Sequence, residues 1–424
     1  MKKSYEAAIK SDNENYYLKL DYAFKLVEAG ELQKAKQLLI SYIPYDSLNP
    51  RLFATLAKIN YWQGDYKTAY QYILKSITLD ESTSETRELY NKIKEAKTPF
   101  VELNTDYSLD NQPLKTISPS LETHVFFNKY FIPNLSIQQQ LFEYNQSTAS
   151  YICKFGNKAI FPYFGITAKS QAGVIIFPDK KILPLGLFSI DKKILKHLTF
   201  NARMERKPYM YMLQSLDTTL LYNEVSTSIN WNSETKGLAQ LLYSRLIFPN
   251  NNYISTFSTW GVLPVFKIWK IQTIAGYSYN YTTSQKDTYA PLNPLNEINN
   301  EINYNSSISG EYKLYMTPKN QIIHRIIGII IIKPNNSINI NLNLRYGFIA
   351  SVNTPYLYGY YNQSQDIAIK REYFPQKYHP LDIQAKINIA ISKQIGLQAE
   401  YQRSMPNFYY TNNYFGIGFK IKIL

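Results

Sequence analysis

The sequence predicts a multidomain α+β protein: α-helical hairpins at the amino terminus, then an antiparallel transmembrane β-barrel of about 12 to 16 strands. Three observations predict this fold class. The part before residue 100 repeats a helical pattern at an offset of 34 residues. Beyond it, apolar and polar residues alternate with the period of a strand. The composition is rich in Asn and in Tyr, with 39 Tyr residues, which suits strands with one polar face.

The helical repeat consists of "YAFKLVEAGELQKAKQLLISYI" and "LFATLAKINYWQGDYKTAYQYILKSI", which align without gaps. Ala23 matches Ala57, and Gly30 matches Gly64. Small Ala side chains let two helices approach closely, and Gly suits the turn between them. Each segment is therefore predicted to form a pair of helices. Pro50 falls in the first turn of the second pair, where proline is tolerated.

These residues and this period resemble the tetratricopeptide repeat (TPR) family over about 16–83, with a capping helix at 84–97. Phe53 and Ala57 replace the family's Trp and Gly in the second unit, so a generic pair of helical hairpins is the alternative. The resemblance implies a concave surface that binds a partner. The residues it places there are Tyr17, Phe24, Arg51, Lys58 and Tyr61. The alternative is that these side chains stack against the neighbouring helix.

The composition changes after the helical part, and three regions are predicted. Residues 1–98 form the TPR-like helical domain, residues 99–123 a linker, and residues 124–424 the barrel. The linker is predicted because "KTPFVELNTDYSLDNQPLKTISPSLE" contains Pro, Ser and Asp and lacks a sustained period.

Strict alternation is clearest in "SININLNLRYGF" (337–348), where Ile and Leu share one face and Asn and Arg the other. "DIQAKINIAI" (382–391) and "IGLQAEYQ" (395–402) repeat the pattern and predict a hairpin. The chain ends in another such segment, "YFGIGFKIKIL". The polar-face candidates of these strands are Asn339, Asn341, Asn343, Arg345, Lys386, Glu400, Lys420 and Lys422.

Two architectures can use such strands. A soluble sandwich buries the apolar face, whereas a membrane barrel turns that face to lipid and encloses the polar one. The barrel is favoured because the strands run about ten residues, enough to cross a bilayer when tilted. Aromatic residues also gather near segment ends, and the polar connections at 283–301 and 403–413 suit extracellular loops. The polar-face candidates would then line a wet lumen.

A short TPR array joined to a carboxy-terminal barrel resembles the outer-membrane exporters of exopolysaccharides such as cellulose or poly-N-acetylglucosamine. "REYFPQKYHPLDIQAKI" (371–387) is similar to the Tyr-Phe-Ser-Pro-Gln motif of those proteins, with the Ser missing between Phe374 and Pro375. "LYMTPKN" (314–320) is a weaker match. An ordinary turn between strands is the alternative role for Pro375 and Pro380.

The resemblance implies a bacterial outer-membrane location, with the TPR domain in the periplasm recruiting a synthase-associated partner or a modifying enzyme. The barrel would pass a polysaccharide outward through a polar lumen. Its basic residues would favour an anionic polymer by their local potential. Alternatively, many Lys and Arg side chains contact the phosphates of outer-membrane lipid.

The sequence predicts that the chain is not an enzyme and has no catalytic residue, no cofactor and no metal site. Four His and the single Cys153 leave little material for metal ligands, and no His lies near a recognisable nucleophile motif. The formal charge of +14 comes from residues scattered through the strands, which argues against a nucleic-acid partner. No apolar run is long enough for a spanning helix, and the start lacks the apolar core of a signal peptide.

Two other functions remain open on these residues. The chain could be a TPR-barrel translocator of surface proteins or lipoproteins, with the TPR part binding the client. It could also be a non-conducting outer-membrane anchor for a periplasmic scaffold. Conductance in planar bilayers separates the anchor from a channel.

Overall fold

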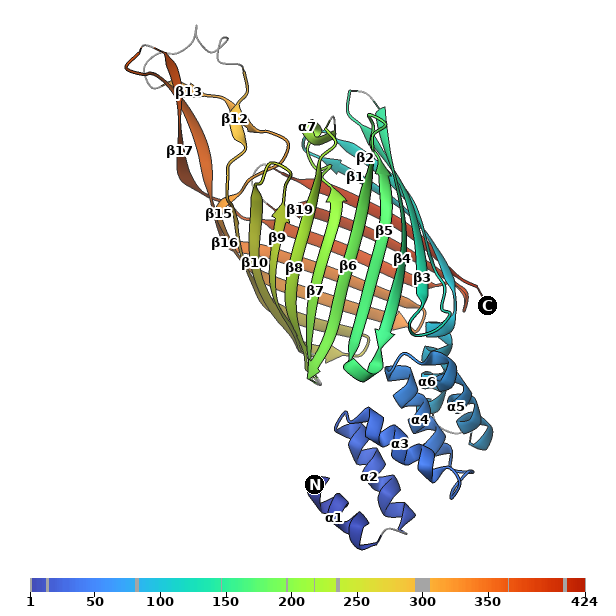
Figure 1. Cartoon of the computed structure of the whole chain (residues 1–424). Helices are drawn as coiled ribbons and strands as arrows, with labels where there is room; N and C mark the ends of the chain where they lie inside the picture. Colours follow the sequence, from blue (N-terminus) through green and yellow to red (C-terminus); the bar gives the residue numbers. More distant parts are fainter. Residues whose placement is uncertain are drawn as a thin grey trace.

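The computed structural model describes residues 2–12, 15–80, 84–145, 147–195, 197–216, 218–233, 237–293, 306–364, 366–406 and 410–423. An amino-terminal helical domain lies at one end of a large β-barrel (Figure 1). Its helices are α1 (Lys2–Ser11), α2 (Tyr16–Glu28), α3 (Leu32–Tyr42), α4 (Pro50–Trp62), α5 (Tyr66–Leu79) and α6 (Ser84–Lys97). None of the helices in these ranges is long and apolar enough to cross a membrane.

The helical hairpins follow the 34-residue period of the sequence. Asn15 and Asn49 begin α2 and α4, and each accepts a hydrogen bond from the backbone N–H three residues on. Such capping satisfies a donor that the first turn otherwise leaves free. Gly30 and Gly64 end the first helix of each hairpin with φ of 81° and 70°, a conformation that costs Gly little. The repeat is therefore expressed as two hairpins with equivalent caps and turns.

Sixteen antiparallel strands within the described residues close into a ring. In ring order they are β1 (Phe100–Asp110), β2 (Lys115–His124), β3 (Ile132–Glu143), β4 (Ser147–Phe161), β5 (Ile166–Ile176), β6 (Ile182–Leu195), β7 (Leu198–Pro208), β8 (Leu221–Asn232), β9 (Leu238–Ile247), β10 (Tyr253–Ile268), β11 (Ile271–Ser284), β15 (Lys319–Asn335), β16 (Ile338–Tyr361), β18 (Leu381–Ala390), β19 (Ile395–Met405) and β20 (Asn412–Lys422). β20 pairs with β1 along its whole length, from Phe100 opposite Lys422 to Asp110 opposite Asn412. Closure leaves the ring without a free edge.

The prediction of a linker at 99–123 is wrong. Residues 100–110 and 115–124 form β1 and β2, which close the barrel against β20 and β3. The alternation is present in "FVELNTDYSLD", where Val101, Leu103 and Tyr107 alternate with Glu102, Asn104 and Asp106. The charged and turn-forming residues of this segment suggested a linker, but they occupy the polar face of a strand.

The two rims of the barrel differ in their connections. On the rim next to the helices, the turns are short, for example 269–270 and 336–337. On the opposite rim, which we call the outer rim, long segments join the strands, including 209–220 and 285–318. The outer segments contain α7 (Leu213–Leu216), β12 (Tyr289–Pro291), β13 (Ser306–Ile308) and β14 (Gly310–Tyr312). The predicted loops at 283–301 and 403–413 lie partly outside the described residues.

A two-stranded ribbon projects beyond the outer rim. β16 continues past the barrel wall and pairs from Ser351 to Tyr361 with β17 (Ile367–Lys377). The chain then returns at Pro380, whose carbonyl accepts the Gly347 N–H at 2.7 Å, and enters β18 beside the lower part of β16. Figure 1 shows this ribbon leaving the barrel beside β13.

The helical domain contacts the barrel rim through side chains of both parts. Tyr66 of α5 packs on Phe126, with ring centroids 4.9 Å apart. Lys422 at the end of β20 forms a 2.5 Å ion pair with Glu95 of α6. The Gly64 turn lies against Ile160, so closely that an added Cβ would come within 2.8 Å of its side chain. The second hairpin is therefore seated on the rim.

Gly64→Ala should destabilise the helical domain more than Gly30→Ala. Both positions have positive φ, so both substitutions carry backbone strain of about 1 kcal/mol. Nothing lies within 4 Å of a Cβ at Gly30, whereas a Cβ at Gly64 meets Ile160. We expect Gly64→Ala to loosen the helices from the rim and to speed proteolysis between α6 and β1. Equal rates for the two variants would contradict the seating of this turn on the barrel.

Candidate functional site: the barrel interior and its outer mouth

One face of the barrel wall is polar along β16, β18, β19 and β20. The strand registers place Asn341 opposite Lys386, Lys386 opposite Glu400, and Glu400 opposite Gly416. The alternate residues on the other face are large and exposed, with Leu344 at 47% and Ile417 at 54%. The apolar face is thus outside the ring.

Contacts between strands that are not neighbours show that the polar face is inside. Lys154 of β4 lies 3.6 Å from Glu205 of β7, although β5 and β6 separate these strands. Such a contact can only cross the concave side of the wall. Arg325 of β15 and Asp382 of β18 similarly approach to 3.9 Å past β16.

The predicted lumen residues all lie on this interior face by strand register. Asn339, Asn341, Asn343 and Arg345 follow one another on β16, opposite Asn388, Lys386, Gln384 and Asp382 of β18. Glu400 on β19 and Lys420 and Lys422 on β20 complete the set. Asn343 donates to Gln384 at 3.2 Å, and Gln384 donates to Glu400 at 2.7 Å. Amides and a carboxylate therefore form a continuous chain across three strands.

Three of the four basic members of this set have carboxylate partners, and Arg345 has none within 4.0 Å among the described residues. Lys386 pairs with Glu400 at 3.6 Å and Lys420 with Glu102 at 4.0 Å. The ammonium of Lys422 is bound to Glu95 of the helical domain, so it belongs to the rim contact. The interior is consequently hydrated and mixed in charge rather than uniformly basic.

Sequence reasoning missed an acidic part of the interior because it lies on the supposed linker. Glu102 and Glu122 face each other in register, and Asp106 accepts a 2.6 Å hydrogen bond from Tyr414. A cavity of about 220 Å³ lies beside them. Its lining comprises Asp106, Ser108, Asp110, Leu114, Thr116, Ser118, Gln138, Gln140, Phe142, Pro208, Met210, Tyr211, Tyr410, Asn412 and Tyr414. These described residues include two carboxylates and no basic side chain.

The segment after β7 crosses the outer mouth. Gln112, in the turn after β1, donates to the Tyr211 carbonyl at 3.1 Å. Met210 lies 3.8 Å from the Ser150 hydroxyl of β4 and belongs to an apolar cluster with Ile175 and Leu221. Parts of the ring that lie far from one another therefore contact the 209–211 segment. This segment narrows the outer mouth of the barrel.

Tyr209 and Tyr315 extend this closure to the other side of the mouth. The Tyr315 ring stacks on Phe248 with centroids 3.6 Å apart, and Tyr209 contacts both rings. Tyr315 is 1% exposed and donates to Asn250 at 2.8 Å. Burial raises the pKa of Tyr209 to about 12.

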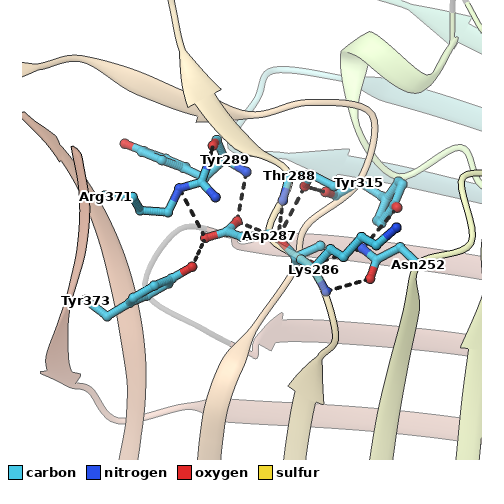
Figure 2. Close-up of polar contacts among 9 residues, drawn as sticks. Asn252, Lys286, Asp287, Thr288, Tyr289, Tyr315, Arg371 and Tyr373 are labelled. Carbon is cyan, nitrogen blue, oxygen red and sulfur yellow. Dashed lines mark hydrogen bonds and ion pairs between the residues drawn. The ribbon is translucent and has the colours of Figure 1, made fainter. Parts of the chain in front are cut away.

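Asp287 joins the 285–318 segment to the projecting ribbon (Figure 2). Its carboxylate accepts hydrogen bonds from Thr317 at 2.9 Å and Tyr373 at 3.0 Å, and Arg371 lies 3.9 Å away. The Asp287 side chain is 4% exposed. Burial, followed by the neighbouring carboxylate, raises the pKa of Tyr373.

The Tyr373 contact shows what the 371–376 motif does in this chain. The motif lies on β17 of the ribbon, not in a turn before a late strand. Asn252, fully buried, holds the same segment from the barrel side by accepting from the Lys286 N–H at 2.8 Å and donating to its carbonyl at 3.1 Å. Ribbon, mouth segment and barrel wall are thus tied together, as Figure 2 shows.

Asp287→Asn should release the ribbon from the mouth segment. The amide keeps the size of the side chain but loses the charge opposite Arg371 and presents a donor to part of the network. We expect about 1–3 kcal/mol of local destabilisation, the usual cost of disturbing a hydrogen-bonded charged group. Faster proteolysis between β16 and β17 would report it. Asp366→Asn, in the exposed turn of the same ribbon, is the matched control and should leave the rate unchanged.

The residues predicted on the helical surface lie in different settings. Tyr17 is 80% exposed, whereas the Arg51 guanidinium lies 4.3 Å over the Phe24 ring. Lys58 lies over Trp62 at 5.0 Å. Tyr61 packs with the core of the second hairpin and with Tyr66. Tyr61 thus stacks on a neighbouring helix, while Tyr17 and Lys58 are open to solvent.

The interior offers groups that can bind and pass a hydrated solute. Across the described ranges, no three His, Cys, Asp or Glu side chains are grouped so that they could hold a metal ion. The interior presents hydroxyls, amides and paired charges, which suit hydrogen bonding to a hydrated solute.

A closed barrel of sixteen strands with an apolar exterior is the fold of bacterial outer-membrane β-barrels. A "Bacterial polysaccharide outer membrane secretin" shares it with a TM-score of 0.54 and 7% identity, over 77% of this chain and 99% of that one. CdiB from Acinetobacter baumannii has a TM-score of 0.43 and 10% identity, over 76% of this chain and 60% of that one. OccD3 from Pseudomonas aeruginosa has a TM-score of 0.40 and 7% identity, over 77% of this chain and 91% of that one. No family model and no curated protein matches the sequence.

Proposed function

We propose that the chain is an export channel of the bacterial outer membrane that passes a polysaccharide through its polar lumen. The observation that carries the proposal is a closed barrel with polar interior faces along β16, β18, β19 and β20, where Asn, Gln and paired charges follow one another. Side chains of this kind hydrogen-bond sugar hydroxyls without holding a charge tightly, so a polymer can slide. The fold shared with a polysaccharide secretin supports the choice of cargo.

The pairing of interior charges bears on the kind of polymer. Lys386 and Lys420 both have carboxylate partners, and the cavity beside Asp106 is acidic. These pairings reduce the positive potential that would favour an anionic cargo. We propose a polymer held by its hydroxyl groups rather than by charge.

The helical domain is proposed to be a TPR-like periplasmic platform for a synthase-associated partner or a modifying enzyme. The equivalent caps and turns at a 34-residue period support this assignment. Its position at the rim with short turns also supports it, because outer-membrane barrels place short turns on the periplasmic side. Tyr17 and Lys58 are the open residues we propose for the partner.

Deleting residues 1–98 from the chromosomal copy tests the proposal. We expect the barrel to assemble and the surface polysaccharide to be lost, because synthesis and export are uncoupled. Tyr17→Ala with Lys58→Ala should lower the polysaccharide while keeping the domain, and Lys67→Ala serves as an exposed control. Loss of a surface protein with unchanged polysaccharide would instead favour a protein translocator. A purified chain without channel events in planar bilayers, even after the mouth segments are loosened, would favour an anchor.

A further inference from the structure

Three arginines lie on the outer face of the wall, each two residues before its strand ends at the outer rim. They are Arg206 of β7, Arg245 of β9 and Arg403 of β19. Arg206 follows Glu205, whose side chain contacts Lys154 across the interior, so alternation turns Arg206 outward. Arg245 is likewise next to interior-facing residues, because its strand neighbour Ser244 is opposite the buried Ser226.

These outward arginines have no acidic partner, unlike the interior basic residues around Glu205. On the interior face, the carboxylate of Glu205 lies 2.7 to 3.6 Å from the charged nitrogens of three basic residues, Lys154, Arg203 and Lys207. For Arg206, Arg245 and Arg403, no carboxylate lies within 4.0 Å in the part of the chain that the structure describes. Positive charge at the outer rim is therefore left for a group outside the protein.

Two tyrosines fix the position of the Arg245 side chain. Its guanidinium lies 4.3 Å over the Tyr253 ring and donates to the Tyr243 hydroxyl at 2.9 Å. Its Nε is shielded from solvent and has no hydrogen-bond partner among the described residues. A guanidinium carries five N–H donors, and the contact with Tyr243 occupies one. The tyrosines fix the plane of the group and leave most donors unused.

The depth of these residues fits a headgroup layer. Further into the wall on the same face lie Ile229 at 39% exposure and Leu241 at 42%. An Arg facing lipid costs about 2–4 kcal/mol at the bilayer midplane but about 0–1 near the interface. The arginines therefore lie within two residues of the outer ends of their strands, near the level of lipid headgroups. Planar guanidinium groups match the oxygens of phosphate in a paired geometry.

We propose that Arg206 and Arg245 form a binding site for the phosphate groups of a phosphorylated outer-leaflet glycolipid. Only β8 separates their strands, which places the two backbones about 10 Å apart laterally. Asn223 of β8 lies opposite Arg206 and adds an amide, and Val225, two residues further along β8, lies opposite Arg245. The inference rests on the outer-membrane location proposed above, but not on the nature of the cargo.

Native mass spectrometry of the full chain in detergent, with lipid A as the probe, tests this site. We expect lipid A carrying both phosphates to be retained, and Arg206→Gln with Arg245→Gln to reduce retention about tenfold or more, since each change removes a charged hydrogen-bond donor. Arg203→Gln, on the same strand but facing the interior, is the matched control and should retain the lipid. The wild type should retain dephosphorylated lipid A no better than the double variant retains phosphorylated lipid A.

Equal retention by the wild type and the double variant would overturn the proposal. So would equal retention of the phosphorylated and dephosphorylated lipids. Displacement of lipid A by an equal concentration of inorganic phosphate would reveal a bare anion site and overturn the glycolipid assignment. Heat-modifiable migration of each variant establishes that it is folded. Channel recordings on the same samples keep the two proposals apart, because conductance without lipid retention rejects only this site.

Discussion

Leu344→Lys should prevent stable assembly of the barrel. Leu344 is 47% exposed on the outer face of β16, between Gly328 and Ile383 of the neighbouring strands. A lysine directed at the middle of the bilayer costs about 2–4 kcal/mol. That is a large share of the roughly 5–15 kcal/mol by which proteins are stable. The folded fraction after refolding into vesicles, read from heat-modifiable migration on gels, measures the effect.

Asn343→Lys is the matched control for that substitution. It places the same charge one residue earlier on the same strand, but on the interior face beside Gln384 and near Glu400. We expect near-normal folding, because water and a carboxylate solvate the new ammonium group. Equal damage from the two substitutions would mean that both faces of β16 are packed, and would reject a barrel with a hydrated interior.

Tyr315→Ala should open the outer mouth. The side chain is buried at 1% exposure, stacks on Phe248 and donates to Asn250. Truncating a buried aromatic residue costs about 3–5 kcal/mol, and here that cost falls on the mouth segment rather than on the closed ring. We expect single-channel conductance to rise severalfold while heat-modifiable migration stays normal.

Tyr315→Phe separates packing from hydrogen bonding at the same position. It keeps the stack on Phe248 and removes only the hydroxyl shared with Asn250 and Asn252. We expect conductance between that of the wild type and that of Tyr315→Ala. Unchanged conductance in Tyr315→Ala would show that the 209–211 segment narrows the mouth without help from the 285–318 segment.

The amino-acid sequence by itself determined the local features. The period of two in "SININLNLRYGF" placed four polar residues on one face, because alternation on a strand is a local property. They are Asn339, Asn341, Asn343 and Arg345. The helical hairpins were equally local, since caps and glycine turns recur at 34 residues. The boundary of the barrel was missed at 99–123, because turn-forming and charged residues there outweighed an alternation that was present.

Tertiary structure decided what those faces meet. Only the pairing of β1 with β20 turns sixteen strands into a ring and makes the polar face an interior. Only the fold brings Glu102 to Lys420, Asp287 to Tyr373, and Tyr315 to Phe248, so that an interior lysine is paired and the outer mouth is narrowed. Partners so far apart in sequence leave no local signal, because their energies depend on distance in space and not on spacing along the chain.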